Sequence, residues 1–482
     1  MRSSGSVLIV CLAVLILGPV LALANGFYVP TVGSRAGAMG GAFIGLADDY
    51  SAVYWNPAGI TQIKGMEVTA TGHDVVSLAS REGFVRFDGY GGAADRYALG
   101  SIAATNRTSN NLSPGFFFLT DAGPLRSVFD KVGVAAYTLS GYGCRWDGDD
   151  VLDNADFVDH QHNFNYLALI GETQDYESDM RAYVISPVIA NELMPGLSVG
   201  VTANFTYGHF QLSDVYMGTY VDTTETPEPD DDYGLLFSPV SVSDDVTGWG
   251  YGATVGVLYR ASTELSVGAT FCTPTTMNYE GTLQVSYDFI PAMDGLLETT
   301  QQTLTYASDF TVKYPMWIGG GLAYRDFIFD GLTMTGGAQW TAWSTLESID
   351  RNVIWGGSWL SPEAQILTRL EQSELEVTEL QWEDTLEFAV GFDYRLGRSM
   401  SISMGYRNSP SPVPDETYDF LMPQSSKNVI SGGVSYRQDY WRASFALEYQ
   451  AGDERRIVGT EDMNGKHVED LLVPSLSFTY SF

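Results

Sequence analysis

The stretch that decides the fold is LSVGVTANFTYG, residues 197–208. Its odd positions, from Leu197 to Tyr207, are apolar, and its even positions are small or polar. This alternation is typical of a β-strand, because successive side chains of a strand point to opposite faces. A second stretch, WGYGATVGVLY at 249–259, has aromatic residues at both ends of its apolar face. Such ends are typical of a membrane barrel, where aromatic girdles lie at the two interfaces.

The same pattern recurs at 265–272, 388–395, 400–407 and 476–482 and has two interpretations. A soluble β-sandwich also has alternating strands. However, several of these strands run ten residues or more, which is the length that a tilted strand needs to cross a bilayer. The connections also alternate between short and long, as periplasmic turns and outer loops do. The short connections lie at 194–196, 261–263, 326–331, 397–399 and 438–440.

This alternation predicts an all-β fold, a transmembrane antiparallel β-barrel of fourteen strands. An even number is what a single-chain barrel needs if both termini are to lie on the periplasmic side. The predicted strands are 66–78, 111–123, 132–143, 177–192, 197–216, 247–260, 264–283, 308–325, 332–349, 384–396, 400–409, 427–437, 441–451 and 469–482.

The chain is predicted to have three parts. Residues 1–24 are typical of a secretory signal peptide, in which Arg2 precedes an apolar run and an A-x-A cleavage pattern. Residues 66–482 are predicted to form the barrel. No run of 18 apolar residues follows residue 24, so the membrane must be crossed by strands and not by helices. Residues 25–65 are rich in glycine and form either a tail or a plug in the lumen. Their aromatic residues favour the plug, because disordered tails are poor in aromatics.

The charge balance and the cysteines exclude two classes of protein. The chain has 25 basic and 59 acidic residues, and loss of Arg2 with the signal peptide leaves 24 − 59 = −35. Nucleic acid is therefore not an expected partner. Cys11 lies in the signal peptide, so only Cys144 and Cys272 remain in the mature chain. A disulfide framework is not expected.

An enzymatic function would need a nucleophile with a base, and the sequence offers no GxSxG, HExxH or CxxC motif. His160 and His162 lie beside several aspartates in DHQH, a composition that could hold a metal. Exposed acidic loops are more often simply solvated. We therefore expect no enzyme, no metal and no cofactor. We expect the acidic outer loops to meet divalent cations that bridge lipopolysaccharide.

The segment NGFYVPTVGSRAGAMGGAFIGLADDYSAVYWNPAGI, residues 25–60, resembles the N-terminal hatch of the FadL/TodX family. These are outer-membrane transporters of long-chain fatty acids and other hydrophobic compounds. The matching hatch motif is the pair Asp48-Asp49 followed by Asn56-Pro57-Ala58. The stretches 312–325, 339–344 and 407–414 also look like later strands of the family. The resemblance implies a fourteen-stranded barrel closed by the hatch, a monomer, in the outer membrane of a Gram-negative bacterium.

The stretch VGVAAYTLSGYG, residues 132–143, is similar to the family's third strand, which bends inward and opens a hole in the barrel wall. The predicted lateral opening comprises Ser140, Gly141, Tyr142 and Gly143. Glycines within a strand mark bulges or kinks, which is consistent with that place. The alternative is that Gly141 to Gly143 end the strand and begin the acidic loop that follows.

Three basic residues are candidates to hold the head group of a charged ligand, because a carboxylate in an apolar lumen needs a partner. Lys427 matches a basic position of the family, and Arg407 and Lys313 are weaker candidates. The alternative is that Lys427 faces lipid headgroups. An uncharged hydrocarbon would need no cation.

The outer loops 217–246 and 284–307 contain apolar clusters, YGLLF and FIPAMDGLL, which are typical of binding surfaces. A short helix is expected at 361–373. The predicted function is passive transport of long-chain fatty acids or other hydrophobic molecules, with lateral release at the third strand. The expected partners are a hydrophobic small molecule, outer-membrane lipid and lipopolysaccharide. A general diffusion porin and an adhesin or structural barrel are the alternatives.

Overall fold

The computed structural model describes residues 31–88, 96–106, 110–146, 176–221, 235–289, 300–355, 376–419, 421–422, 424–458 and 465–482. Several expectations from the sequence lie outside these residues. They are the signal peptide at 1–24, the pair His160 and His162, the helix at 361–373, and the side chains of YGLLF and FIPAMDGLL.

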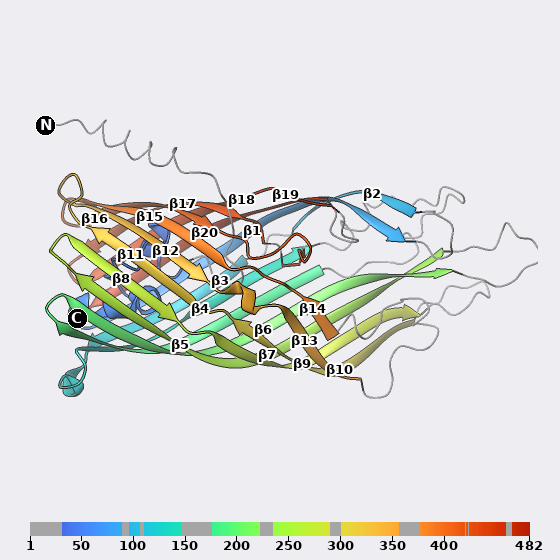
Figure 1. Ribbon diagram of the computed structural model, residues 1–482, viewed down its shortest axis with the longest axis horizontal. Coiled ribbons are helices and arrows are strands. Elements are labelled where there is room, and N and C mark those ends of the chain that lie inside the picture. Colours follow the sequence, from blue (N-terminus) through green and yellow to red (C-terminus); the bar gives the residue numbers. More distant parts are fainter. Residues whose placement is uncertain are drawn as a thin grey trace, which may run out of the picture.

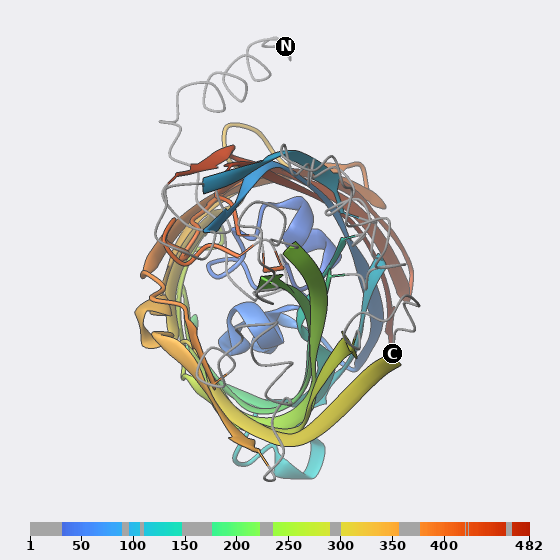
Figure 2. The same cartoon turned by 90° about the vertical axis from the view of Figure 1, so that its right-hand side faces the viewer.

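The structure is a closed antiparallel barrel (Figure 1; Figure 2). Its described residues form twenty strand segments, of which six continue a neighbouring segment of the same wall strand, so the wall has fourteen strands. The first and last strands pair, with Glu67 opposite Ser481, and this pairing closes the barrel. The segments are β1 Glu67–Asp88, β2 Arg96–Thr105, β3 Asn110–Asp121, β4 Lys131–Trp146, β5 Tyr176–Met194, β6 Leu197–Val221, β7 Leu235–Arg260, β8 Leu265–Cys272, β9 Thr275–Phe289, β10 Thr300–Tyr314, β11 Trp317–Tyr324, β12 Leu332–Thr341, β13 Ser348–Ile354, β14 Val377–Glu379, β15 Thr385–Leu396, β16 Met400–Ser409, β17 Lys427–Gln438, β18 Trp441–Gly452, β19 Arg455–Ile457 and β20 Gly465–Ser481. The predicted fold class is confirmed.

The membrane band can be measured on β7, where the side chains of Trp249 and Tyr259 are both exposed on the outer face. They are separated by ten residue steps of about 3.3 Å, or about 33 Å along the strand. A strand tilted by about 40° then covers a height of about 25 Å, which is the height of an outer-membrane apolar band. The two aromatic residues therefore mark the two interfaces.

The strands on the side of the long loops are longer than predicted. β1 continues to Asp88, β6 continues to Val221, and β7 already begins at Leu235. The predicted outer loops 217–246 and 284–307 are therefore partly strand, and this part of the prediction was wrong. A strand above the membrane faces water on its outer side, so it does not need the apolar alternation that identifies a membrane strand.

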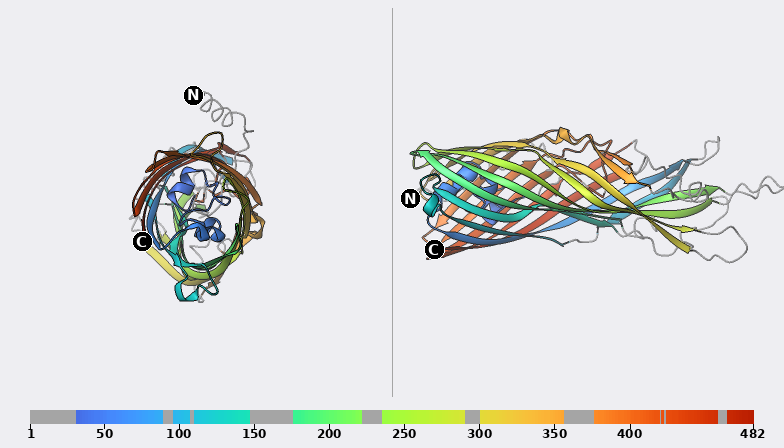
Figure 3. Two further views of the ribbon diagram at one scale, coloured as in Figure 1. Left: turned by 90° about the vertical axis from the view of Figure 1, so that its left-hand side faces the viewer. Right: turned by 90° about the horizontal axis from the view of Figure 1, so that it is seen from below.

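Residues 31–65 form a hatch inside the barrel, at the end that carries the C-terminus (Figure 3). The hatch contains α2 Ser34–Ala38, α3 Ala52–Trp55 and the 3-10 helix η1 Pro57–Gln62. Most of its side chains are buried. Within the described ranges, no helix has both the length and the apolar character needed to span a membrane.

Candidate ligand path through the lumen

The hatch packs directly against glycines of the barrel wall. A Cβ atom added to Gly256 of β7 would lie 2.1 Å from Asn56 Oδ1, and one added to Gly200 of β6 would lie 2.3 Å from the Pro57 carbonyl carbon. A Cβ on Gly268 of β8 would lie 2.3 Å from Ile44 O. No side chain fits at such distances, so glycine is required at these three positions. The sequence showed them only as small residues on one strand face.

Asn56 explains why the chain places Asn-Pro-Ala before its barrel. Its Nδ2 donates to Ile44 O and to Val257 O, both at 3.0 Å, so it joins two parts of the hatch to β7. Its Oδ1 accepts from Ala58 N at 3.2 Å and caps η1, while Pro57 occupies the first position of that helix. Asn56, Pro57 and Ala58 are all buried. This part of the hatch motif therefore ends one helix, starts the next and fixes both to the wall.

The two aspartates of the hatch motif have different partners. Asp48 and Asp393 of β15 both pair with Arg35, at 2.5 and 3.1 Å. Burial alone would lower the pKa of Arg35, but Asp48, Asp393 and Asp49 raise it well above its ordinary value. Asp49 is buried and accepts hydrogen bonds from Ser51 N and Ser51 Oγ at 2.9 and 2.7 Å. The first aspartate thus links the hatch to the wall through Arg35, and the second supports the start of α3.

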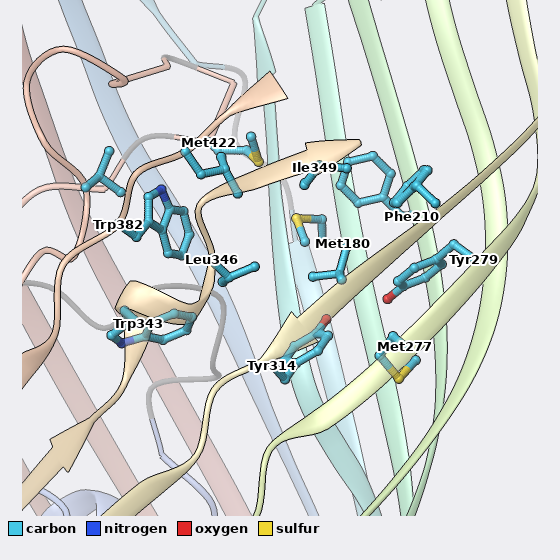
Figure 4. Close-up of a cluster of buried hydrophobic side chains, with 14 of the residues drawn as sticks. Met180, Phe210, Met277, Tyr279, Tyr314, Trp343, Leu346, Ile349, Trp382 and Met422 are labelled. Carbon is cyan, nitrogen blue, oxygen red and sulfur yellow. The ribbon is translucent and has the colours of Figure 1, made fainter. Parts of the chain in front are cut away.

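Beyond the hatch, the lumen is filled by apolar and aromatic side chains, here called the lumen cluster (Figure 4). Phe310 of β10 stacks on Tyr279 with ring centroids 5.4 Å apart and meets Phe210 edge-on at 5.6 Å. A water-filled porin would instead have a polar lumen. The cluster comprises Met180, Ala182, Phe210, Val246, Met277, Tyr279, Phe310, Val312, Tyr314, Trp343, Leu346, Ile349, Leu380, Trp382, Val413, Tyr418, Met422 and Ile457.

A small pocket lies where the hatch meets the wall. Its volume is about 20 Å³, which is enough for a water molecule but not for an organic ligand. Its lining includes Phe43, Ile44 and Trp55 from the hatch, and Glu387 and Arg407 from the wall. This pocket is therefore too small to be the binding site of an organic ligand.

The third wall strand, β4, leaves the regular ladder at Leu139, where its pairing with β5 shifts register between Thr138 and Ser140. Its pairing with β3 runs only from Lys131 to Tyr137 within the described residues. Beyond that point, consecutive residues such as Ser140 and Gly141 are both buried, so the alternation between a lumen face and an outer face is lost.

The predicted lateral residues lie in this part of β4. Gly143 is buried like Ser140 and Gly141, and Tyr142 pairs with Met180 in the ladder, although its side chain is not among the described ones. β4 continues to Trp146, so the strand does not end at Gly141 to Gly143. The irregularity begins one residue before Ser140.

Two of the three candidate head-group residues are diagonal neighbours on the lumen face, because Lys427 of β17 pairs with Ser409 of β16, two residues from Arg407. Lys427 is buried and its Nζ lies 2.6 Å from Glu469 Oε2. Arg407 is buried with Glu448, at 3.7 Å. Lys313 is exposed on the strand face opposite to that of its buried neighbours on β10, so it faces outward. The described residues contain no group of three His, Cys, Asp or Glu that could hold a metal ion.

Known proteins share this architecture. A Pseudomonas aeruginosa FadL homologue superposes with a TM-score of 0.68 at 15% identity, over 95% of this chain and 100% of that one. The Pseudomonas putida toluene transporter TodX gives 0.63 at 15% identity, over 94% and 99%. The Ralstonia pickettii toluene transporter TbuX gives 0.61 at 15% identity, over 94% and 99%. At such identities these likenesses show the fold alone, and no curated protein matches the sequence.

The sequence itself matches a family model, described as outer membrane protein transport protein (OMPP1/FadL/TodX), over residues 161–482. That range is about two thirds of the chain and lies entirely within the barrel, so it is independent of the hatch motif. The chain belongs to the OMPP1/FadL/TodX family, the Gram-negative outer-membrane barrels that transport hydrophobic compounds.

Proposed function

We propose that this chain is a passive outer-membrane route for hydrophobic small molecules, which leave sideways at β4. The observation that carries this proposal is an apolar lumen cluster directly above a hatch that closes the barrel. Moving about 100 Å² of apolar ligand surface from water into such a lumen is favourable by about 2.5 kcal/mol. Neither an energy source nor a covalent step is required.

The charges favour an uncharged ligand over a fatty acid. Lys427 is paired with Glu469, and Arg407 lies with Glu448 while Glu387 also faces it. A fatty-acid carboxylate entering the lumen would have to compete with these buried carboxylates for the cations, and breaking a buried pair is costly. Long-chain fatty acids remain the second candidate, because the family resemblance includes them.

Uptake of labelled toluene and of labelled oleate by cells that express the protein tests the ligand class. We expect toluene uptake to rise above that of cells without the protein, and oleate uptake to rise less. Equal uptake of both would favour a route that also takes fatty acids. If neither enters while small hydrophilic sugars do, the proposal is refuted and a porin remains.

The interrupted pairing between β3 and β4 supports lateral exit, because a gap in the ladder leaves room for a ligand to pass into lipid. Replacing Gly141 by Trp would fill this gap. We expect this variant to bind ligand in the lumen but to release it into the bilayer more slowly than the wild type. The matched control is Gly432→Trp in β17, since a Cβ there meets no atom closer than 3.8 Å. Unchanged release from the Gly141→Trp barrel would rule out exit at β4.

A further inference from the structure

The connection between β16 and β17 folds into the barrel. It is here called the strap and comprises residues 410–419, 421, 422 and 424–426; residues 420 and 423 are outside the described part of the chain. Val413, Tyr418, Leu421 and Met422 are all buried. Three of these four side chains belong to the lumen cluster, and Figure 4 shows Met422 among cluster side chains of other strands.

The strap crosses the lumen from one wall to the opposite one. It starts and ends at β16 and β17, but Ser178 of β5, which is not a neighbour of either strand, donates a hydrogen bond to Leu421 O at 2.5 Å. In the middle of the strap, Thr417 Oγ1 donates a hydrogen bond to Leu380 O at 2.6 Å. Ser178 lies beyond the exposed Tyr183 of β5, on the side away from the short turn at Gly196. The strap therefore covers the outer side of the lumen cluster, as the hatch covers its inner side.

One side chain, Arg455 of β19, contacts four residues of the strap. Its guanidinium donates to Val413 O and to Gln424 O, both at 2.9 Å. It also pairs with the Asp415 carboxylate, and its Nε donates there at 3.0 Å. The guanidinium carbon lies 4.7 Å from the centre of the Tyr418 ring. Charge-assisted bonds are stronger than neutral ones, and a guanidinium also stacks well on an aromatic face. Arg455 thus fixes the start, the middle and the end of the strap together.

We propose that the strap is an outer gate, and that Arg455 is the positioning residue that keeps it closed. This inference rests on the proposed function, because the gate matters only if a ligand passes through the lumen cluster. A hydrophobic molecule then enters when the strap lifts and leaves when the hatch or the β4 region opens. Tyr418 and Met422 both close the gate and line the ligand compartment, so they also select the ligands that fit.

The two cysteines of the described residues can report separately on movement of the strap and on movement of the hatch. Cys144 of β4 is buried and lies within electrostatic range of Tyr418 and Asp419 of the strap. Cys272 of β8 is half-buried and packs, together with Tyr54, against a cluster of hatch and wall side chains that includes Trp55 and Trp317. Neither cysteine is in a disulfide. Lifting the strap should expose Cys144 to a thiol reagent and leave Cys272 protected, whereas displacing the hatch should expose Cys272.

The test is the rate of maleimide labelling of each cysteine in purified full-length protein, in the wild type and in Arg455→Gln. The matched control is Arg456→Gln, since Arg456 is the next residue, is 76% exposed and pairs with Glu454. We expect Cys144 labelling to be at least tenfold faster in Arg455→Gln, with Cys272 unchanged, and the control to behave like the wild type. Equal acceleration at both cysteines would indicate a loosened barrel and would overturn the proposal, as would an unchanged Cys144 rate.

A second variant keeps the proposal testable if Arg455→Gln does not assemble, as judged by heat-dependent migration on a gel. Asp415→Asn removes the negative charge opposite Arg455 and leaves the bonds of Arg455 to the two carbonyls, so a smaller acceleration at Cys144 is expected. No acceleration in this variant would also overturn the gate. Toluene uptake separates the two proposals. Faster Cys144 labelling without uptake of toluene or oleate in any variant supports the gate and refutes the proposed function.

Discussion

The attachment of the hatch to the barrel wall gives the most demanding prediction. It concerns the replacement of Asn56 by alanine. The Asn56 carboxamide is fully buried and takes part in three hydrogen bonds, to Ile44 O, to Val257 O and from Ala58 N. Only the bond to Val257 O crosses from the hatch to the wall, and a hydrogen bond of this kind contributes about 1 kcal/mol net to seating the hatch. Since about 1.4 kcal/mol is a factor of ten, the equilibrium should shift roughly fivefold toward a displaced hatch.

The rate of maleimide labelling of Cys272 measures this shift, because that thiol packs against hatch side chains and becomes accessible when the hatch is displaced. We expect this labelling to be roughly fivefold faster in Asn56→Ala. The matched control is Asn204→Ala of β6, because Asn204 is also buried and bonds to Ser186 Oγ and Thr254 Oγ1, at 2.8 and 3.0 Å, within the wall. If the Asn56 variant inserts normally and Cys272 is labelled at the wild-type rate, steric fit rather than hydrogen bonding holds the hatch, and the reasoning fails.

Three further predictions concern the wall. Gly256→Val should prevent seating of the hatch, because a Cβ there would lie 2.1 Å from a hatch oxygen. It should therefore speed the labelling of Cys272 in the same assay, whereas Gly432→Val should not. Lys427→Met should destabilise the barrel by about 3 to 5 kcal/mol, because it removes the cation 2.6 Å from the buried Glu469 carboxylate. The double change with Glu469→Leu should recover most of this in a urea titration. Phe310→Ala should weaken toluene binding, measured by fluorescence competition, because it removes the ring on which the lumen aromatics stack; unchanged affinity would place the ligand elsewhere.

The membrane-spanning strands and the hatch could be predicted from the sequence for separate reasons. A strand in the bilayer has lipid on one face and the lumen on the other, so period two follows directly from the environment. The hatch motif was found because Asp48, Asp49, Asn56, Pro57 and Ala58 are close together in sequence and resemble the pattern of the family. The family match confirms the resemblance drawn from that motif.

The parts of β1, β6 and β7 above the membrane could not be predicted, because strands in water lack this constraint. The ion pairing of the candidate basic residues could not be predicted either, because ion pairs join residues that are far apart in the chain. Lys427 meets Glu469 across β18, and Arg407 meets Glu448, and neither pair has a sequence spacing that marks it.

The sequence by itself determined the barrel, its number of strands and the presence of a hatch, because each depends on local patterning repeated along the chain. The tertiary structure alone decided that Gly200, Gly256 and Gly268 form the seat of the hatch and that the strap lies across the lumen. These features depend on which strands face each other once the barrel closes. That relation is set by the pairing of β1 with β20 and by the register of every strand between them, and it has no local signature.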